Sequence, residues 1–499
     1  MSEQVRHPPG LVDAAPAVWR AWLPSWPWIV GLLAMLRALA SPLALLNDPD
    51  TYMHIAAGRW MLTHAALPAA EPFSFTMAGQ HWVPGEWLGE VVLAAVYAAA
   101  GWGGVIVLSA AGFGLAVGLL ARFLARRLDA MPAVIAALAG AVLVLPHLLA
   151  RPHVLALPLL VLWCGALFAA RDDNRAPPWA LLPVMLCWAN LHGSFLFGIA
   201  LALYLAAEAV LAAPEGTARR HAAIRWGGFI LAAAALCVVN PNGPDAIVQP
   251  FRLMAMPALQ SGFGEWQPAD LVRFPALAAW LLGAGAVVVL GWRALPWTRL
   301  ALLAALAYMA LAHVRHADLL GLVGPLVIAA PAAPRLAMLL RPAAGSPVLR
   351  AAALFARPAR LPALCLVIAL ALAAGLPSLM RPVDRTGDAV TPAAALAAAR
   401  AMNLTGPVFN SEAFGGYLIF AGVPTFIDGR IELYGNAFLA GYLAAERGDA
   451  AALAGLLDRY RIGWTLVQAQ APMAAALDRL SGWRRVYADG RAVIHVRQD

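Results

Sequence analysis

Two carboxylates and an imidazole stand close together early in the chain. Asp48 and Asp50 are separated by a proline, and His54 follows one helical turn after Asp50, so that both side chains can face one pocket. A carboxylate placed this way suits proton transfer as a general base, and the group also suits a hard divalent cation. Asp48 and Asp50 are therefore our candidate catalytic residues. A structural interpretation stays open for Asp50, which can N-cap the helical stretch 51–63.

Polar residues suited to binding a substrate recur in short motifs between apolar runs. Arginine binds phosphate through paired hydrogen bonds, which makes Arg151 and Arg315 candidates for a phosphate group. Glu265 and the tryptophan after it resemble part of a sugar-binding lining. Structural alternatives remain, because an interfacial arginine often reaches lipid headgroups and a buried Asn is often a polar staple between helices. The candidate substrate-binding residues are His54, Arg59, Glu86, Arg151, His153, Asn190, His192, Glu265, Arg315 and His316.

The elements that must position these residues are membrane-spanning helices. Of the 499 residues, 62% are hydrophobic and 12% are charged, whereas a soluble domain carries about 25% charged residues. The sequence contains no lysine, which excludes a Schiff-base lysine and a P-loop. The net charge of +8 does not indicate nucleic-acid binding, because the arginines fall in clusters between apolar runs, as in cytoplasmic loops.

Charge placement selects one topology for these apolar runs. A spanning helix needs about 20 apolar residues, whereas 86–100 is shorter and carries Glu86 and Glu90, so we expect an interfacial helix there. Arginine clusters, from Arg6 and Arg20 to Arg350, then all fall inside, which predicts eleven spans, a cytoplasmic N-terminus and an outer C-terminus. The spans begin near Trp26, Gly103, Met131, Val154, Pro178, Ser194, Ile224, Phe274, Pro296, Asp318 and Leu361.

This topology divides the chain into two domains and puts all of the polar motifs on the extracytoplasmic side. Residues 1–380 form the membrane domain, with interfacial helices in its first outer loop, 47–100. Residues 381–499 form a small extracytoplasmic α/β domain, because short apolar runs alternate there with helical segments. The expected strands are 407–409, 424–427, 464–467 and 493–496, and the expected helices are 394–402, 437–446 and 473–480. In this domain we expect Arg430 and Glu432 to form a surface ion pair without a catalytic role.

An apolar first span followed by an acidic outer loop resembles the GT-C superfamily of membrane glycosyltransferases. In its protein-mannosyltransferase and aminoarabinose-transferase branch, the loop pattern is matched here by Asp48, Tyr52, Ile55 and Ala56. A closer resemblance is to a group of uncharacterised bacterial multispanning proteins of presumed GT-C type. The positions that carry this second resemblance are Asp48, Pro49, Asp50, His54, Gly58, Arg59, Trp60, Trp82, Glu86, Trp87, Leu88, Arg151, Pro152, His153, Asn190, His192, Gly193, Gly415, Gly416, Tyr417, Asp428, Gly429 and Arg430.

The GT-C resemblance implies an enzyme of the bacterial inner membrane whose C-terminal domain is periplasmic. It implies transfer of a sugar from a polyprenyl-phosphate donor in the membrane lipid to a glycan, lipid or protein acceptor of the cell envelope, as in polysaccharide assembly. Asp48 would then act as general base, and Arg151 or Arg315 would stabilise the leaving phosphate. No cofactor is required, although a divalent cation stays open. The alternatives are a non-catalytic assembly protein and a transporter or flippase for a lipid-linked glycan.

Overall fold

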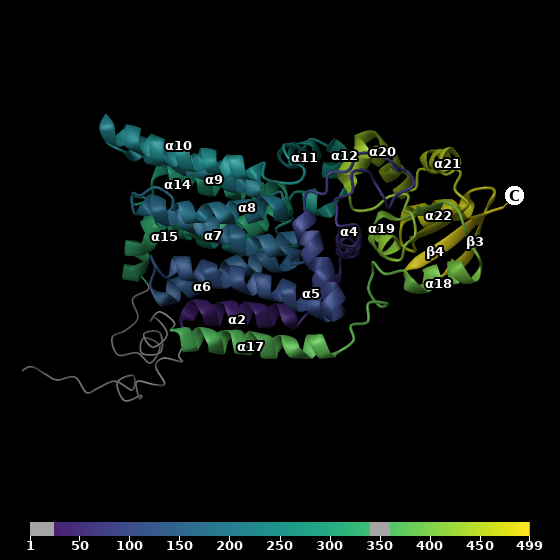
Figure 1. Cartoon of the computed structure of the whole chain (residues 1–499), viewed down its shortest axis with the longest axis horizontal. Coiled ribbons are helices and arrows are strands. Elements are labelled where there is room, and N and C mark those ends of the chain that lie inside the picture. Colours follow the sequence, from purple (N-terminus) through teal and green to yellow (C-terminus); the bar gives the residue numbers. More distant parts are fainter. Residues whose placement is uncertain (1–23, 340–359, 499) are drawn as a thin grey trace, which may run out of the picture.

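The computed structural model describes residues 24–339 and 360–498, and consists of a bundle of long helices with a small sheet beyond one end of it. Figure 1 shows the helices lying side by side along the long axis of the molecule. Arg6, Arg20 and Arg350, which entered the topology prediction, lie outside the described residues. The bundle helices are α2 (Trp26–Leu39), α5 (Trp87–Leu124), α6 (Ala130–Val144), α7 (Pro152–Asp172), α8 (Leu182–Leu191), α9 (Phe195–Ala212), α10 (Thr217–Cys237), α13 (Pro275–Gly291), α14 (Trp297–Ala312), α15 (Ala317–Leu339) and α17 (Leu361–Met380).

Length and composition identify this bundle as a membrane structure. Among the described residues, six helices are long and apolar enough to cross a membrane, and four further apolar helices are shorter. The chain is therefore a membrane protein. Each of the eleven predicted spans coincides with one helix of the bundle. The exact number of crossings, and which terminus lies inside, remain predictions.

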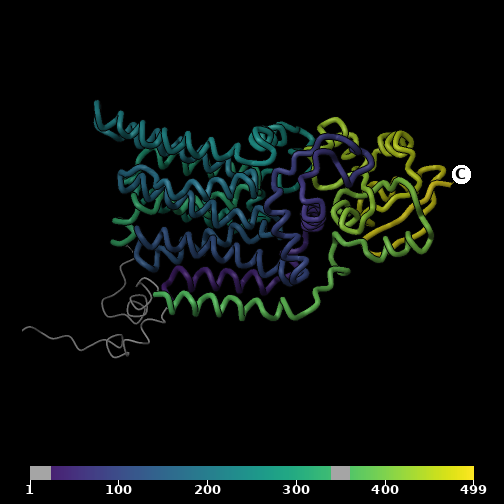
Figure 2. Tube along the Cα trace, in the orientation of Figure 1, coloured from purple at the N-terminus to yellow at the C-terminus, as the bar shows by residue number. Residues whose placement is uncertain are grey.

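Helix α5 contains a sharp break that separates two segments of different direction. Ala100 and Gly101 have non-helical backbone angles, with φ −143° and +57° respectively. Glycine has no Cβ and adopts a positive φ without steric cost, so it is suited to this turn. The segment before the break runs across the ends of the neighbouring helices, whereas the segment after it runs alongside them (Figures 1 and 2). The predicted end of the short helix at Ala100 thus coincides with a real change in direction.

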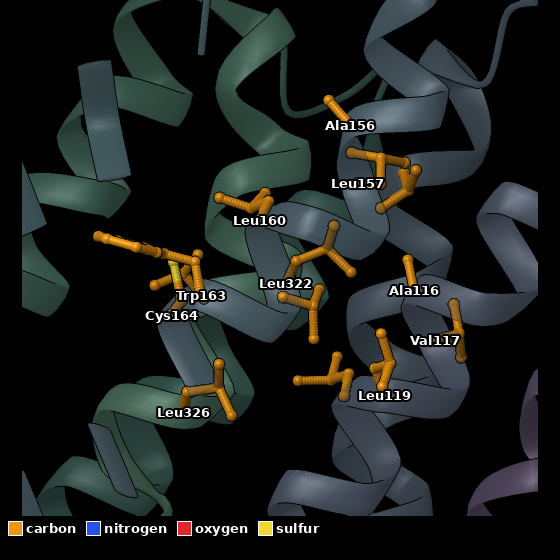
Figure 3. Close-up of a cluster of buried hydrophobic side chains, with 14 of the residues drawn as sticks. Ala116, Val117, Leu119, Ala156, Leu157, Leu160, Trp163, Cys164, Leu322 and Leu326 are labelled. Atoms are coloured by element: carbon orange, nitrogen blue, oxygen red, sulfur yellow. The ribbon is translucent and has the colours of Figure 1, made fainter. Parts of the chain in front are cut away.

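The core of the bundle is apolar and tightly packed. Figure 3 shows apolar side chains of α5, α7 and α15 meeting, among them Leu119, Trp163 and Leu322. Close approach of helices depends on small residues: a Cβ on Gly140 of α6 would lie 2.2 Å from the carbonyl oxygen of Gly321 in α15. Helix pairs in membranes commonly pack in this way, because lipid offers no hydrophobic driving force between them.

Short elements close the end of the bundle that faces the sheet. The helix predicted at 51–63 is confirmed as α4, but the expectation that Asp50 caps it is wrong, because α4 begins at Asp50 itself. The N-cap position belongs to Pro49. The carboxylate of Asp48, one residue earlier, accepts hydrogen bonds from the backbone N–H of Asp50 and, at 3.3 Å, from the hydroxyl of Thr51. The short elements are α3 (Pro42–Leu46), α4 (Asp50–His64), η1 (Leu145–His147), η2 (Trp179–Leu181), α11 (Asp245–Met254), α12 (Pro257–Gly262), η3 (Gly264–Trp266) and η4 (Val314–His316).

The C-terminal part contains a four-stranded sheet in the order β1-β2-β4-β3, in which only the β1–β2 pair is parallel. Three of the four predicted strands are confirmed. The fourth is wrong, because Thr425 makes only an isolated bridge, to Ser74 of the first outer loop. The elements are α18 (Ala393–Ala401), β1 (Val408–Asn410), α19 (Glu412–Phe420), α20 (Ile431–Glu446), α21 (Ala450–Arg459), β2 (Trp464–Gln468), α22 (Pro472–Arg479), β3 (Trp483–Ala488) and β4 (Ala492–Arg497).

Candidate functional site

Four loops that are distant in sequence bring their charged residues together at the end of the bundle nearest the sheet. Asp48 lies between α3 and α4, Arg151 immediately precedes α7, Glu265 lies in η3 and Arg315 lies in η4. Ion pairs connect all four residues into one chain. Sequence reasoning placed these motifs on one side of the membrane, and the structure adds that they are in contact.

Asp48 and Arg151 form the buried centre of this chain. Both carboxylate oxygens of Asp48 accept hydrogen bonds from Arg151, at 2.6 Å from Nε and 2.5 Å from Nη2. Only 1% of the Asp48 side chain is exposed. Burial alone would raise the pKa of Asp48, but the charge and hydrogen bonds of Arg151 outweigh it, so the net pKa is lowered. Asp48 is therefore held as a carboxylate with its lone pairs already engaged.

Asp50 is in a different state although it lies only two residues away. Its Oδ2 is 3.1 Å from Nη1 of Arg151, while its Oδ1 is buried without a hydrogen-bond partner in the described structure. Burial raises the pKa of Asp50 to about 6, more than Arg151 lowers it, and the charge of Asp48 adds to the rise. Asp50 thus has one oxygen without a hydrogen-bond partner and a pKa of about 6, close to neutral pH.

Arg315 is held more loosely than Arg151. Its Nη1 lies 3.1 Å from Oε1 of Glu265, and its guanidinium stacks over the ring of Trp266 at 4.3 Å. Glu265 also lies 3.8 Å from Arg151, and 37% of its side chain is exposed. Stacking orients the planar guanidinium and leaves most of its N–H groups free for an anion. The site is therefore most accessible on the side of Glu265 and Arg315.

A second row of groups, alternating imidazole and carboxylate, lies beside the first. His54 Nδ1 is 3.2 Å from Oε1 of Glu90, and its Nε2 is 3.7 Å from Oε2 of Glu86. The other oxygen of Glu86 is 3.2 Å from Nε2 of His192, whose Nδ1 is 2.7 Å from the hydroxyl of Ser194. The structure therefore brings His54, Glu86 and His192 together. Glu90 belongs to the same row, and sequence reasoning treated it only as a mark of an interfacial helix.

The protonation of this row follows from its spacing. Burial alone would lower the pKa of His54, but the hydrogen bond to Glu90 and the charge of Glu86 raise it to about 8. Partial burial raises the pKa of Glu86 to about 7, against the lowering effect of His54. The His54 imidazolium can only donate a hydrogen bond, whereas Glu86 can donate to a hydroxyl group when protonated and accept from one when ionised.

Two predicted site residues lie apart from these two rows. Arg59 is exposed and its guanidinium stacks over Phe420 of α19 at 4.7 Å. All polar atoms of the Asn190 side chain are engaged between helices: its oxygen accepts from the indole N–H of Trp87 at 3.0 Å, and its nitrogen donates to two backbone carbonyls. The geometry of Asn190 thus favours the alternative interpretation, a polar staple.

The two remaining predicted histidines line the edges of the site. His153 Nε2 donates to the backbone carbonyl of His147 at 3.1 Å, and its ring lies 6.2 Å from that of His192. His316 follows Arg315 and lies 3.3 Å from the carbonyl oxygen of Met309. Both rings therefore pack against the site while one nitrogen of each is used locally.

Sequence reasoning missed a buried cluster in which the C-terminal part meets the first outer loop. Arg430 is only 2% exposed and bonds both Asp428, at 2.8 and 2.7 Å, and Glu71. The prediction that Arg430 forms a surface ion pair with Glu432 is therefore wrong. Glu71 lies 359 residues away in sequence, which leaves no local signal for the pairing. Only the Asp428-Gly429-Arg430 motif marked this region.

The donor set was also tested for a metal ion. Among the described residues, no three His, Cys, Asp or Glu side chains are grouped so that they could hold one. Asp48, Asp50 and His54 do not converge, because the two aspartates turn toward Arg151 and His54 turns toward the glutamates. These residues do not fit a divalent cation in this arrangement, and no step of the chemistry below uses one.

Solved structures resemble this fold, although no family model and no curated protein matches the sequence. One is the archaeal oligosaccharyltransferase AglB from Archaeoglobus fulgidus in complex with an inhibitory peptide and a dolichol-phosphate, at a TM-score of 0.51 and 13% identity, covering 93% of this chain and 74% of that one. Another is ArnT from Cupriavidus metallidurans in the apo state, at 0.48 and 14% identity, covering 94% and 97%.

The likeness to AglB shows the fold. AglB and ArnT are both glycosyltransferases of the GT-C superfamily, and the extensive match to AglB shows that this chain has the GT-C fold. The resemblance inferred from the acidic first loop is thereby confirmed at the level of the fold. A fold alone does not specify a reaction, which has to be argued from the site.

Proposed function

We propose that this protein transfers a sugar from a polyprenyl-phosphate-linked donor to an acceptor on the extracytoplasmic side of the bacterial inner membrane. One observation carries the proposal: Asp50 and Arg315 belong to the same series of ion pairs. Asp50 has a buried oxygen without a hydrogen-bond partner in the described structure, and the side chain of Arg315 is 31% exposed. Sugar transfer from a phosphate carrier needs both a proton acceptor for the incoming hydroxyl and a cation for the departing phosphate. The GT-C fold supports the use of a lipid-linked donor.

The geometry divides the work of the two aspartates. Asp48 is our predicted general base, but its two oxygens are occupied by Arg151 and its pKa is lowered, which makes it a weak base. Asp50 has a free oxygen and a pKa of about 6. We therefore assign proton acceptance to Asp50, while Asp48 holds Arg151 in place. A base works best when its pKa lies near the working pH.

The two arginines divide in the same way. Arg151 is surrounded by Asp48, Asp50 and Glu265, so little of its guanidinium remains for a substrate. Arg315 contacts Glu265 and stacks on Trp266, which leaves a pre-oriented cation at the accessible side. We assign the phosphate to Arg315. A guanidinium in such a place stabilises the negative charge that develops as the carrier leaves.

The proposed step is an inverting displacement. The acceptor hydroxyl attacks the anomeric carbon of the donor sugar, a new glycosidic C–O bond forms, and the bond from that carbon to the carrier phosphate breaks. The hydroxyl proton passes to Asp50, and the polyprenyl phosphate departs beside Arg315. His54 and Glu86 orient hydroxyl groups of the sugar or acceptor from the second row.

An apolar cavity next to the site supports a lipid carrier. It has a volume of about 450 Å³ and is lined mainly by apolar side chains, including Trp87, Leu186 and Val239. Cys187 also lines it and is exposed, whereas Cys164 and Cys237 are buried. In a Cys365→Ala background, we expect maleimide labelling of Cys187 to be slowed by polyprenyl phosphate. Unchanged labelling at saturating lipid would remove this cavity from the proposal.

A vesicle assay tests the reaction itself. Purified protein is reconstituted and supplied with candidate polyprenyl-phosphate sugars, chosen after mass spectrometry of the lipid that copurifies with it. We expect Asp50→Asn to lower kcat at least about 100-fold, and Asp48→Asn to lower it less while also weakening the fold of the site. If Asp48→Asn abolishes turnover and Asp50→Asn does not, the base is Asp48. Full turnover by both variants would favour an assembly or flippase role.

A further inference from the structure

The C-terminal part of the chain touches the turn that carries both aspartates. A Cβ built on Gly429 would lie 1.8 Å from Oδ1 of Asp50, and one built on Gly416 would lie 2.0 Å from the carbonyl oxygen of Pro49. A side chain at position 416 would collide with backbone, and one at position 429 would force the Asp50 carboxyl to move. Gly429 does not have a positive φ. Its requirement is therefore for space beside Asp50, since its backbone conformation is open to other residues.

The segment that carries Gly429 is fixed by a buried ion network. Arg430 bonds Asp428 with Nε and Nη2, at 2.8 and 2.7 Å, and bonds Glu71 with Nη2 at 2.9 Å. The hydroxyl of Tyr434 donates to Asp428 at 2.7 Å. The guanidinium also contacts the aromatic rings of Phe73 and Trp82, whose centroids lie 5.1 and 4.7 Å from its central carbon. Paired, hydrogen-bonded and enclosed charges of this kind impose a single geometry on the segments they join.

Backbone hydrogen bonds join the same two segments a few residues away. The N–H of Thr425 donates to the carbonyl of Phe73, and the N–H of Phe75 donates to the carbonyl of Thr425, each at 3.1 Å. The hydroxyl of Thr76 donates to the carbonyl of Phe426 at 2.7 Å. The first outer loop and the C-terminal part thus form one continuous wall beside Asp50.

We propose that the Asp428–Arg430 turn is a wall of the candidate site, in which Gly429 is a positioning residue that lies against the Asp50 carboxyl and sets its proton affinity. The inference rests on the proposed role of Asp50 as proton acceptor. Gly429 lies against Oδ1 of Asp50, which is buried, while Oδ2 faces Arg151. The fixed turn thereby shields the carboxyl from solvent on this side and favours its protonated form.

Other groups around Asp50 also act on its charge and have to be kept constant in any test. None of them is altered by a substitution at position 429. These groups are Asp48, His54, Glu86, Arg151, Glu265 and Glu412.

A double-mutant cycle on the thermal stability of the purified protein tests the contact. We expect Gly429→Ala to lower Tm by several degrees in the parent, and most of that loss to disappear in an Asp50→Ala background, where the colliding carboxyl is gone. Gly441→Ala is the matched control, because nothing lies within 4 Å of its Cβ position. It should give the same small gain in both backgrounds, because alanine has the higher helix propensity. An equal loss from Gly429→Ala in the two backgrounds would overturn the proposal.

The same variants have a second use if Gly429→Ala alone fails to accumulate. Accumulation of Gly429→Ala/Asp50→Ala would then be the expected rescue, and failure of both would contradict the contact. Gly416→Ala provides a further contrast, because a Cβ at Gly416 meets the backbone of Pro49. The loss of Tm in Gly416→Ala should therefore persist when the Asp50 side chain is removed.

The pH dependence of Tm tests the effect on proton affinity. The difference in Tm between the parent and Asp50→Asn should change between about pH 4 and pH 6 and level off above pH 6, the folded-state pKa of Asp50. In the Gly429→Ala background, a displaced and hydrated carboxyl should move this upper limit down toward pH 4. An unmoved upper limit would overturn the positioning role. Neither measurement needs a substrate, so failure of this inference and failure of the proposed transferase reaction are distinguishable.

Discussion

Helix α7 carries a charge network at each end, and the two networks differ in how completely their charges are matched. At the site end, Arg151 and Arg315 face the three carboxylates Asp48, Asp50 and Glu265, and one oxygen of Asp50 is buried without a partner. The far end lies 21 residues further along α7, which corresponds to roughly 30 Å. Comparing the two ends separates charges that hold helices together from charges that remain available to a ligand.

Both carboxylates of the far-end network, Glu208 and Asp172, are paired with arginines. Arg299 is only 2% exposed, and its Nε bonds both oxygens of Glu208, at 3.1 and 3.0 Å, while its Nη2 bonds Asp172 at 2.7 Å. Arg171 adds a second cation, 3.0 Å from Glu208. The residues come from α7, α9 and α14, so the network ties three helices together. Matched buried charges fix geometry, whereas the unmatched carboxyl at the site end retains capacity to bind.

The largest expected effect comes from opening the far-end network. We expect Arg299→Met to destabilise the protein by about 3–5 kcal/mol, because two carboxylates lose their buried partner. The measurement is thermal or denaturant unfolding in detergent. Arg273→Met is the control, since Arg273 is 89% exposed and pairs with Asp270 only at 3.5 Å, and should leave Tm nearly unchanged. Equal effects of the two variants would show that the far-end network is not structural.

The next largest expected effect is a difference between Asp50 and Asp48 in how each changes the free energy of unfolding with pH. Folding raises the pKa of Asp50 from 3.8 to about 6, so it favours the protonated form. The parent should therefore lose stability relative to Asp50→Asn as pH rises from about 4 to 6, by at most about 3 kcal/mol, since each pKa unit is worth about 1.4 kcal/mol. Unfolding of both proteins across this pH range measures the difference.

Asp48 supplies a control of opposite sign. Its pKa is lowered on folding, mainly because Arg151 outweighs burial. Its contribution is therefore present above its unfolded pKa and is lost as pH falls through the lower folded value. The parent should lose stability relative to Asp48→Asn on acidification. The same sign for both variants would contradict the division of roles between the two aspartates.

The sequence predicted which polar motifs lie together at one end of the helix bundle, but it did not predict the contacts between their side chains. Arginine clusters and apolar lengths placed Asp48, Arg151, Glu265 and Arg315 on one side, because alternate loops of a spanning bundle must share a side. Loop position does not determine orientation, however. That Asp48 holds Arg151, while Asp50 keeps an oxygen free, depends on side-chain directions that no spacing specifies.

The C-terminal part shows the same limit. Apolar runs predicted β1, β2 and β4, whereas β3 was missed because its Arg484 and Arg485 are exposed at the edge of the sheet. Charged residues on an edge strand protect it from further pairing and hide it from a search for apolar runs. Thr425 was assigned to a strand of that sheet, but its partner is Ser74 of a distant loop. Long-range pairing of this kind has no local signature.

A substitution of Asn190 tests whether this residue binds substrate or only stabilises the helix packing. Its amide joins α8 to Trp87 of α5 and to the carbonyl of Val239, so we expect Asn190→Ala to cost about 1–3 kcal/mol. Unfolding measures that loss. In the vesicle assay, the pH profile of turnover should not move, because neither row of titratable groups is altered. A changed pH profile with unchanged stability would return Asn190 to the substrate-binding residues.

The smallest expected effect is at Arg59, which resembles neither network because it is paired with no carboxylate in the described structure. Its guanidinium stacks on Phe420 of α19 and links α4 to the C-terminal part. An exposed cation–π contact contributes about 0.5–1 kcal/mol, so Arg59→Ala should lower stability by that amount, and Arg59→Lys should restore part of it. Turnover measured below the melting range should be unchanged. Loss of turnover without loss of stability would instead mean that Arg59 binds substrate, and the site would then extend along α4 beyond the reach of Arg151.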